Sequence, residues 1–158
     1  MTRIKKRRLL REKALQMLYS YTFNPDGVEL SKKIILNDLN KSEDLNFVDS
    51  LVSKVIENKN YFEEIIKNKV DNWELHRITI IDRIILYIGI CEFLYFPDIP
   101  PKVTINELIE IAKLFSTSNS GKFINGILDQ IYNELKSSNK ITKSGRGLLE
   151  DSLPNKTK

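Results

Sequence analysis

The stretch ITIIDRIILYIGICEFLYF, residues 78–96, is the most apolar part of this 158-residue chain. It has about the length of a membrane span, but Asp82, Arg83 and Glu92 interrupt it. Only eight uncharged residues remain between Arg83 and Glu92, which is too short a run to cross a bilayer. The stretch therefore predicts a central helix that is buried almost all round. No apolar segment of the signal-peptide type follows the basic N-terminus, and we expect a soluble, cytoplasmic protein.

Apolar residues at helical spacing predict six further helices around this central one. Strand-like alternation is scarce, so the predicted fold class is all-α with about seven helices. The sequence TINE, residues 104–107, has the spacing of a capping box and predicts the start of a helix. The segment DNWEL, residues 71–75, is expected to be a junction with Trp73 packed at its edge. The six expected helices cover residues 9–21, 30–39, 47–56, 61–70, 104–115 and 122–135.

Positive charge is concentrated at the N-terminus of the chain. The net charge is +4, but residues 1–13 hold seven basic side chains and one acid. Residues from 139 onward carry a net +3, which leaves −5 for the middle of the chain. The N-terminal run indicates either a localised polyanion-binding site or a solubilising arm. Because it continues into the amphipathic helix expected over residues 9–21, an ordered cationic patch is favoured. The polar residues 137–158 show little periodicity and predict a mobile tail.

The sequence gives little support to an enzyme. Cys91 and His76 are the only cysteine and histidine, so a disulfide within the chain is impossible and a zinc site or a Cys/His catalytic pair is improbable. No glycine-rich phosphate loop or nucleophile motif occurs. We therefore expect a non-enzymatic protein without a cofactor or a metal.

Two short segments are candidates for binding RNA. Tyr19 and Gln16 lie beside the buried stripe of the first helix, where they could meet unstacked bases. In SNSGKFINGILDQI, residues 118–131, Lys122 and Phe123 open the last helix, whose free N–H groups favour anions. Ser120 could cap this helix, and Gly121 would allow a backbone to come close. Alternatively, Phe123 only seals the rim of the core, which spacing alone favours.

Five segments together resemble the NusB family of bacterial transcription antitermination factors. The resemblance covers about residues 3–136, and the combination of the last two segments is the most specific part of it. The segments are RRLLREKALQMLY (7–19), FVDSLVSKV (47–55), IDRIILYIGICEFL (81–94), IPPKVTINELIEIAKLF (99–115) and KFINGILDQI (122–131).

The resemblance implies two small helical-bundle subdomains within residues 1–136, at about 1–73 and 74–136. It also implies binding of single-stranded boxA RNA together with the ribosomal protein NusE, in an RNA polymerase complex that contains NusA and NusG. Such a complex suppresses termination, chiefly in ribosomal RNA operons. Asp82 matches a position near the protein partner. The RNA-binding positions implied are Arg7, Arg8, Arg11, Gln16, Tyr19, Asn119, Ser120, Gly121, Lys122 and Phe123.

Two other functions stay open from the sequence. The same helical fold resembles the RNA-binding domain attached to ribosomal RNA cytosine methyltransferases, so the chain could act with such an enzyme. It could also be a helical scaffold that binds only protein. Binding of single-stranded RNA, with and without the ribosomal partner, distinguishes the scaffold from an antitermination factor.

Overall fold

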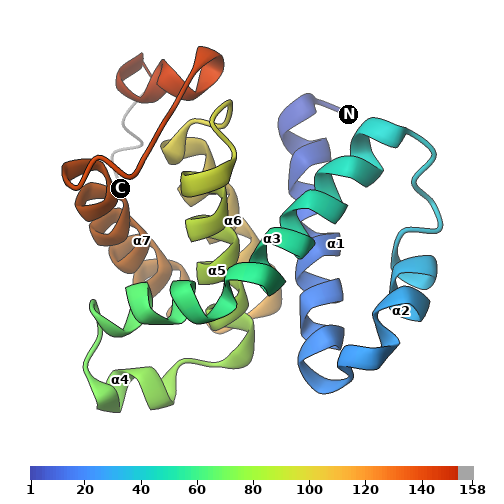
Figure 1. The fold of residues 1–158 in the computed structure, drawn as a ribbon, viewed down its shortest axis with the longest axis horizontal. Helices are drawn as coiled ribbons and strands as arrows, with labels where there is room; N and C mark the ends of the chain where they lie inside the picture. The colour runs from blue at the N-terminus through green and yellow to red at the C-terminus, as the bar shows by residue number, and fades with distance from the viewer. Residues whose placement is uncertain (153–158) are drawn as a thin grey trace.

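The computed structural model describes residues 1–152, without the side chains of residues 72, 73 and 150–152. Its described part is all-α, as the sequence predicts, and contains seven α-helices (Figure 1). Two short 3-10 helices, η1 and η2, accompany them. The elements are α1 (Arg3–Phe23), η1 (Pro25–Gly27), α2 (Val28–Ile35), α3 (Ser42–Lys67), α4 (Asn72–Arg77), α5 (Ile80–Tyr95), α6 (Pro101–Phe115), α7 (Ser120–Ser137) and η2 (Gly145–Ser152).

Helix α5 is the centre of the molecule, as predicted. Most of its residues are buried, and helices α1, α3, α6 and α7 all pack against it. Gly89 allows α7 to approach α5 closely, because a Cβ at this position would lie 2.7 Å from a methyl group of Leu128 on α7. Among the described residues, no helix is both long and apolar enough to cross a membrane.

One continuous helix, α3, replaces the two helices predicted over residues 47–56 and 61–70. The polar run ENKN, residues 57–60, interrupts the apolar stripe and suggested a break. Asn58 and Lys59 instead continue the helix, and the Asn58 side chain donates to the Lys54 carbonyl oxygen at 2.8 Å. In place of the junction predicted at residues 71–75, Asp71 caps the short helix α4 through a capping box with Glu74. The predicted packing of Trp73 lies outside the described side chains.

The predicted capping box at residues 104–107 is wrong, because α6 begins earlier, at Pro101. A proline suits the first turn of a helix, where its missing N–H would have no partner in any case. Thr104 and Glu107 therefore lie one turn inside the helix, and both side chains are buried against other elements. Thr104 donates to Glu92 of α5 at 2.8 Å.

The described part of the polar C-terminus folds back on the body. We call residues 139–149 the C-terminal segment. Lys143 donates to the carbonyl oxygens of Glu92 and Phe96 at 3.0 and 2.9 Å, at the end of α5. Burial lowers the pKa of Lys143 to about 8, against the raising effect of the Glu92 and Asp98 charges. For residues 139–149 these contacts contradict the predicted mobile tail; residues 153–158 of that prediction lie outside the described residues.

Helix α3 crosses from the side of α1 and α2 to the side of α5 and α7 (Figure 1). The buried apolar residues of both sides form one continuous core. The division into subdomains at about residue 73 stays a prediction.

Candidate nucleic-acid interface

The basic start of α1 is largely neutralised by carboxylates within the protein. Arg3, Lys5 and Arg7 form no ion pair with the described residues, and Arg7 is half-buried with its guanidinium 4.0 Å from the Phe47 ring centroid. Burial and the nearby charges of Arg11 and Arg3 lower the pKa of Arg7. The other four basic side chains of residues 1–13 are paired: Lys6 with Asp44, Arg8 with Glu107, Arg11 with Glu92 and Lys13 with Asp38.

Arg11 is part of the core rather than of the exposed face. It is only 1% exposed, and its Nε and Nη2 donate to the two carboxylate oxygens of Glu92 at 2.7 and 2.8 Å. Burial opposes the charge on Arg11, but the Glu92 carboxylate more than offsets it, and the pKa of Arg11 is raised. The expectation that Arg11 contacts RNA phosphates on an exposed helix face is therefore wrong in this structure.

Arg8 connects α1 to α6, and this contact shows which side of α1 faces α6. Its Nε and Nη2 donate to Glu107 at 2.6 and 3.1 Å. Tyr19 follows Arg8 by eleven residues, which is about three helical turns, so it projects in nearly the same direction about 16 Å further along α1. Tyr19 is 43% exposed, and its ring centroid lies 5.0 Å from that of Phe23. Gln16 is also exposed.

The start of α7 is held by Asp82, near the beginning of α5. Both carboxylate oxygens of Asp82 accept hydrogen bonds, from Ser116 at 2.7 Å and from Ser120 at 2.9 Å. Asp82 is 6% exposed, so the expectation that it contacts a protein partner is not supported by its position. The expected capping role of Ser120 is also wrong: Asn119 is the N-cap residue, and Ser120 is buried in the first turn. Asp82 and Ser120 position the loop rather than a ligand.

Around this buried anchor, the remaining predicted residues lie at the surface. Asn119 and Lys122 are exposed, and Lys122 forms no ion pair with any described residue. Gly121 is partly buried, but a Cβ there would meet only a methyl group of Ile109, at an ordinary 3.5 Å. Phe123 is partly buried and packs on the rim of the core. Phe123 therefore packs against the core and is still partly accessible to solvent.

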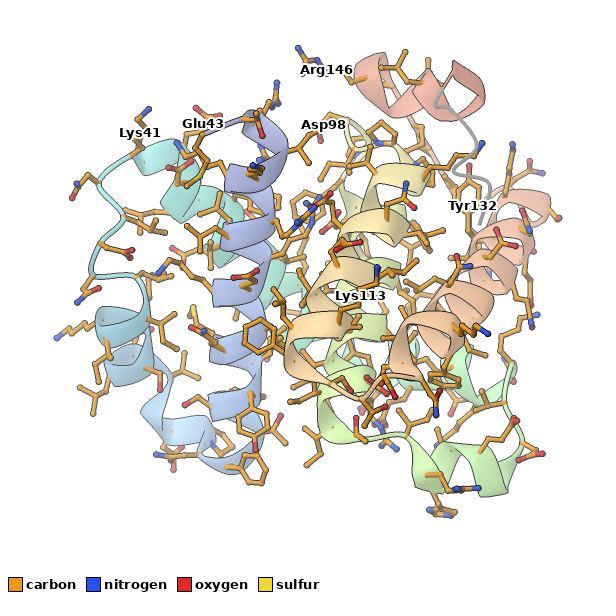
Figure 2. The ribbon with its side chains drawn as sticks, turned by 180° about the vertical axis from the view of Figure 1, so that it is seen from behind. Lys41, Glu43, Asp98, Lys113, Tyr132 and Arg146 are labelled. Atoms are coloured by element: carbon orange, nitrogen blue, oxygen red, sulfur yellow. The ribbon has the colours of Figure 1, made fainter. Side chains whose placement is uncertain are left out.

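The structure brings the two predicted segments to one side of the molecule, with α6 between them. In Figure 2, α1, α6 and the first turns of α7 lie next to one another on the viewed side. Helices α1 and α6 descend in the same direction from the Arg8–Glu107 pair. Tyr19 lies near the end of α1 at Phe23, and the loop before α7 follows the end of α6 at Phe115, so both lie toward the lower ends of these two helices. We call this surface the α1–α6 face; its predicted members are Arg8, Gln16, Tyr19, Asn119, Gly121, Lys122 and Phe123.

Sequence reasoning missed the carboxylates that organise this face. Glu92 was noted only as a charge that interrupts an apolar helix, and Asp82 as such a charge and, through the resemblance, as a position near the protein partner. A charge inside a buried helix requires a partner, and this was the available signal. The partner itself, Arg11, is 81 residues away from Glu92 and has no local signature.

The described residues show no constellation for metal or nucleophilic chemistry. They contain no group of three or more His, Cys, Asp or Glu side chains that could hold a metal ion. Cys91 is buried in α5, and burial raises the pKa of its thiol, which disfavours the reactive thiolate.

Comparisons with known proteins identify relatives of this chain. The NusB family model matches residues 8–133. The transcription antitermination protein NusB of Chloroherpeton thalassium is 47% identical over 148 residues, covering 91% of this chain and 69% of that protein. The protein of the same name from Bacillus cereus is 44% identical over 132 residues, covering 82% and 99%.

Solved structures share the fold. T. maritima NusB has a TM-score of 0.75 at 35% identity, covering 81% of this chain and 91% of its own. A crystal structure of the antitermination factors NusB and NusE in complex with dsRNA contains a chain with a TM-score of 0.73 at 20% identity, covering 85% and 99%. At that identity the second likeness shows the fold alone. The family model and the relatives together show that this chain belongs to the NusB family.

Proposed function

We propose that this protein is a transcription antitermination factor that binds boxA-type single-stranded RNA together with the ribosomal protein NusE. The RNA–protein assembly would join the RNA polymerase elongation complex with NusA and NusG in the cytoplasm and suppress termination, chiefly in ribosomal RNA operons. What supports the proposal is the α1–α6 face, on which α1, with its exposed Tyr19, lies next to α6 and the first turns of α7.

The chemistry of this face suits single-stranded RNA. Splayed bases stack on aromatic rings, and each stack contributes about 1–3 kcal/mol. Gln16 and Asn119 are exposed amides that can both donate to and accept from base edges. Lys122 and the free N–H groups of the first turn of α7 are suited to a phosphate between two bases. The face is thus able to read bases as well as to hold the backbone.

The protein partner would dock elsewhere on the body. Because Asp82 is buried, we propose that the exposed acidic residues of the body, rather than Asp82, attract the basic ribosomal protein. The alternative of a module acting with a methyltransferase gains nothing from the relatives, since the Bacillus cereus protein is matched over 99% of its own length.

The test is a titration of labelled boxA RNA and of a scrambled RNA at fixed salt, with and without NusE. We expect Phe123→Leu, which keeps apolar packing but removes the ring face, to weaken boxA binding about tenfold and the scrambled RNA much less. Tyr61→Leu is the matched control, because Tyr61 is an exposed aromatic residue on α3, outside the α1–α6 face.

Equal losses for the two RNAs would remove the base-contacting role of Phe123. Failure of the unmodified protein to bind either RNA, even with NusE, would reject the proposed function and favour a scaffold that binds only protein.

A further inference from the structure

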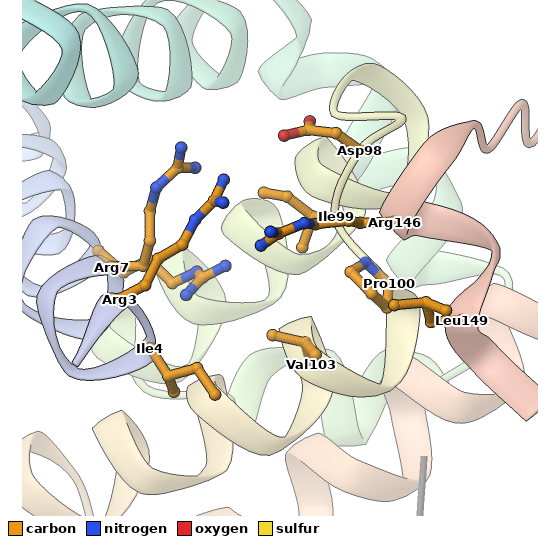
Figure 3. Close-up of a pocket in the computed structure, with 10 residues that line it drawn as sticks. Arg3, Ile4, Arg7, Asp98, Ile99, Pro100, Val103, Arg146 and Leu149 are labelled. Carbon is orange, nitrogen blue, oxygen red and sulfur yellow. The ribbon is translucent and has the colours of Figure 1, made fainter. Parts of the chain in front are cut away.

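A pocket of about 230 Å³ lies between the first turns of α1 and the start of α6. Figure 3 shows the side chains of Arg3 and Arg7 entering it from α1 and that of Arg146 from the opposite side. Its apolar wall comes from Ile4, Ile99, Pro100 and Val103. We call it the arginine pocket.

The C-terminal segment closes one side of this pocket, and it lies beyond the residues that the family model matches. Besides the Lys143 contacts, the Ser144 N–H donates to the Pro97 carbonyl oxygen at 3.0 Å. Gly147 packs so tightly against that carbonyl group that a Cβ would collide with it. The segment is therefore seated on the loop before α6, and this seating directs Arg146 into the pocket (Figure 3).

The pocket carries an excess of positive charge. Four arginine side chains line it together with one carboxylate, Asp98, and among the described residues three of these arginines, Arg3, Arg7 and Arg146, form no ion pair. The buried Arg11 also lines the pocket, and its Nη1 has no hydrogen-bond partner in the described part of the chain. Buried N–H groups rarely go without an acceptor, and converging cations repel one another. An anion in the pocket would offer an acceptor to the Arg11 Nη1 and would reduce the repulsion between the guanidinium groups.

The position of the pocket identifies the source of that anion. Val103 lines the pocket and is one helical turn before Glu107 on α6, while Ile4 is one turn before Arg8 on α1. The pocket is thus continuous with the α1–α6 face. A strand that lies on this face and extends toward the start of α1 would bring a phosphate to the guanidinium groups.

We propose that the C-terminal segment extends the RNA-binding surface, with Arg146 joining Arg3 and Arg7 around a backbone phosphate of the bound single-stranded RNA. This inference rests on the proposed function and adds to it a binding residue outside the family-matched region. Guanidinium groups bind phosphate through paired hydrogen bonds, and the apolar wall can support the adjoining sugar or base. Because a phosphate is common to all sequences, the pocket adds affinity without reading bases.

The test measures RNA affinity between about 0.05 and 0.3 M salt for four variants of the full chain. Arg146→Gln removes the charge, Arg146→Lys keeps it, and Gly147→Ala unseats the segment while leaving every charge in place. Lys140→Gln is the matched control, with the same change of charge in the same segment but outside the pocket.

We expect Arg146→Gln to weaken boxA and scrambled RNA alike by about three- to tenfold and to lower the salt slope by about 0.7, the value for one phosphate contact on a single strand. Gly147→Ala should cause a similar loss of affinity, Arg146→Lys a smaller one, and Lys140→Gln little change. Circular dichroism establishes that each variant is folded.

Unchanged affinity and slope for Arg146→Gln, in a protein that still binds RNA, would overturn this inference and leave the proposed function standing. If inorganic phosphate shifts the Arg146 Nε–Hε resonance but RNA does not, the pocket binds a small anion and the RNA assignment is wrong. If the unmodified protein binds no RNA, both proposals fail.

Discussion

The two ends of the α1–α6 face are built in opposite ways. The α1 end is rich in charge, but four of the seven basic side chains in residues 1–13 are paired with carboxylates of the protein. The α7 end has only Lys122 as a cation, yet this side chain is exposed and forms no ion pair with the described residues. The comparison shows that the charge counted in a sequence overstates the charge available to a ligand.

Both ends are nevertheless anchored by the same helix. Glu92, near the end of α5, accepts from Arg11 of α1 and from Thr104 of α6. Asp82, near its beginning, accepts from Ser116 and Ser120 at the start of α7. The central helix therefore holds one carboxylate under each end of the face. The anchors differ in kind, because Glu92 pairs with a buried cation and Asp82 with neutral hydroxyl groups.

The largest effect is expected from Arg11→Ala. This change leaves Glu92 buried without its counter-charge, and the loss of one partner from a buried pair destabilises a protein by about 3–5 kcal/mol. Arg8→Ala is the matched comparison, because Arg8 itself is only partly buried and solvent can reach the Glu107 carboxylate after the change, so the loss should be smaller, about 1–3 kcal/mol. Urea denaturation of both variants measures the difference. Similar losses in the free energy of unfolding for the two variants would show that the deeper burial of Arg11 does not make its ion pair more important for stability than that of Arg8.

A smaller effect is expected from Asp82→Asn. The side-chain amide can accept at one oxygen only, so one of the two serine hydroxyl groups loses its acceptor, at a cost of about 1–3 kcal/mol. The loss falls on the loop before α7. Amide hydrogen exchange should therefore speed up at residues 120–123 more than in the middle of α5. Uniform acceleration throughout the protein would mean that Asp82 supports the whole fold rather than this loop.

The sequence was a good guide to the helices and to the exposed part of the face. Helical periodicity correctly placed Tyr19 and Gln16 at the surface of α1, because local spacing determines which way a helical residue points. Periodicity could not reveal that the Arg11 position is buried, because this depends on Glu92 in a distant helix. Thr104 has the spacing of a helix cap in the sequence, but its hydroxyl group donates to the Glu92 carboxylate of a distant helix, which local spacing could not reveal.

The docking of the C-terminal segment on the body also could not be predicted from the sequence. Its contacts are mainly hydrogen bonds to backbone carbonyl oxygens. Because the accepting residues contribute only their backbone, their side chains show no pattern that would reveal these contacts. Lys143 looks like any other lysine of a polar tail until the end of α5 is placed beside it. Isolated polar residues thus carry less information about packing than apolar ones.

The smallest change in stability, and the sharpest test of the α7 end, comes from a pair of glycines in one helix. A Cβ has room at both positions: Gly121 would meet only Ile109, at 3.5 Å, and Gly126 meets nothing within 4 Å. Alanine is favoured over glycine in a helix by about 0.5–1 kcal/mol, so neither Gly121→Ala nor Gly126→Ala should destabilise the fold. Thermal unfolding checks that expectation for both variants.

RNA binding should separate the two variants. Gly121 lies in the first turn of α7, where a methyl group would stand between the free N–H groups and an approaching phosphate, whereas Gly126 lies beyond that turn. We therefore expect Gly121→Ala to weaken boxA RNA several-fold and Gly126→Ala to leave it unchanged, at equal or higher stability. Unimpaired binding by Gly121→Ala would mean that the backbone at the start of α7 does not approach the RNA. The face would then depend on side chains alone, and the exposed Lys122 would hold the phosphate without help from the helix.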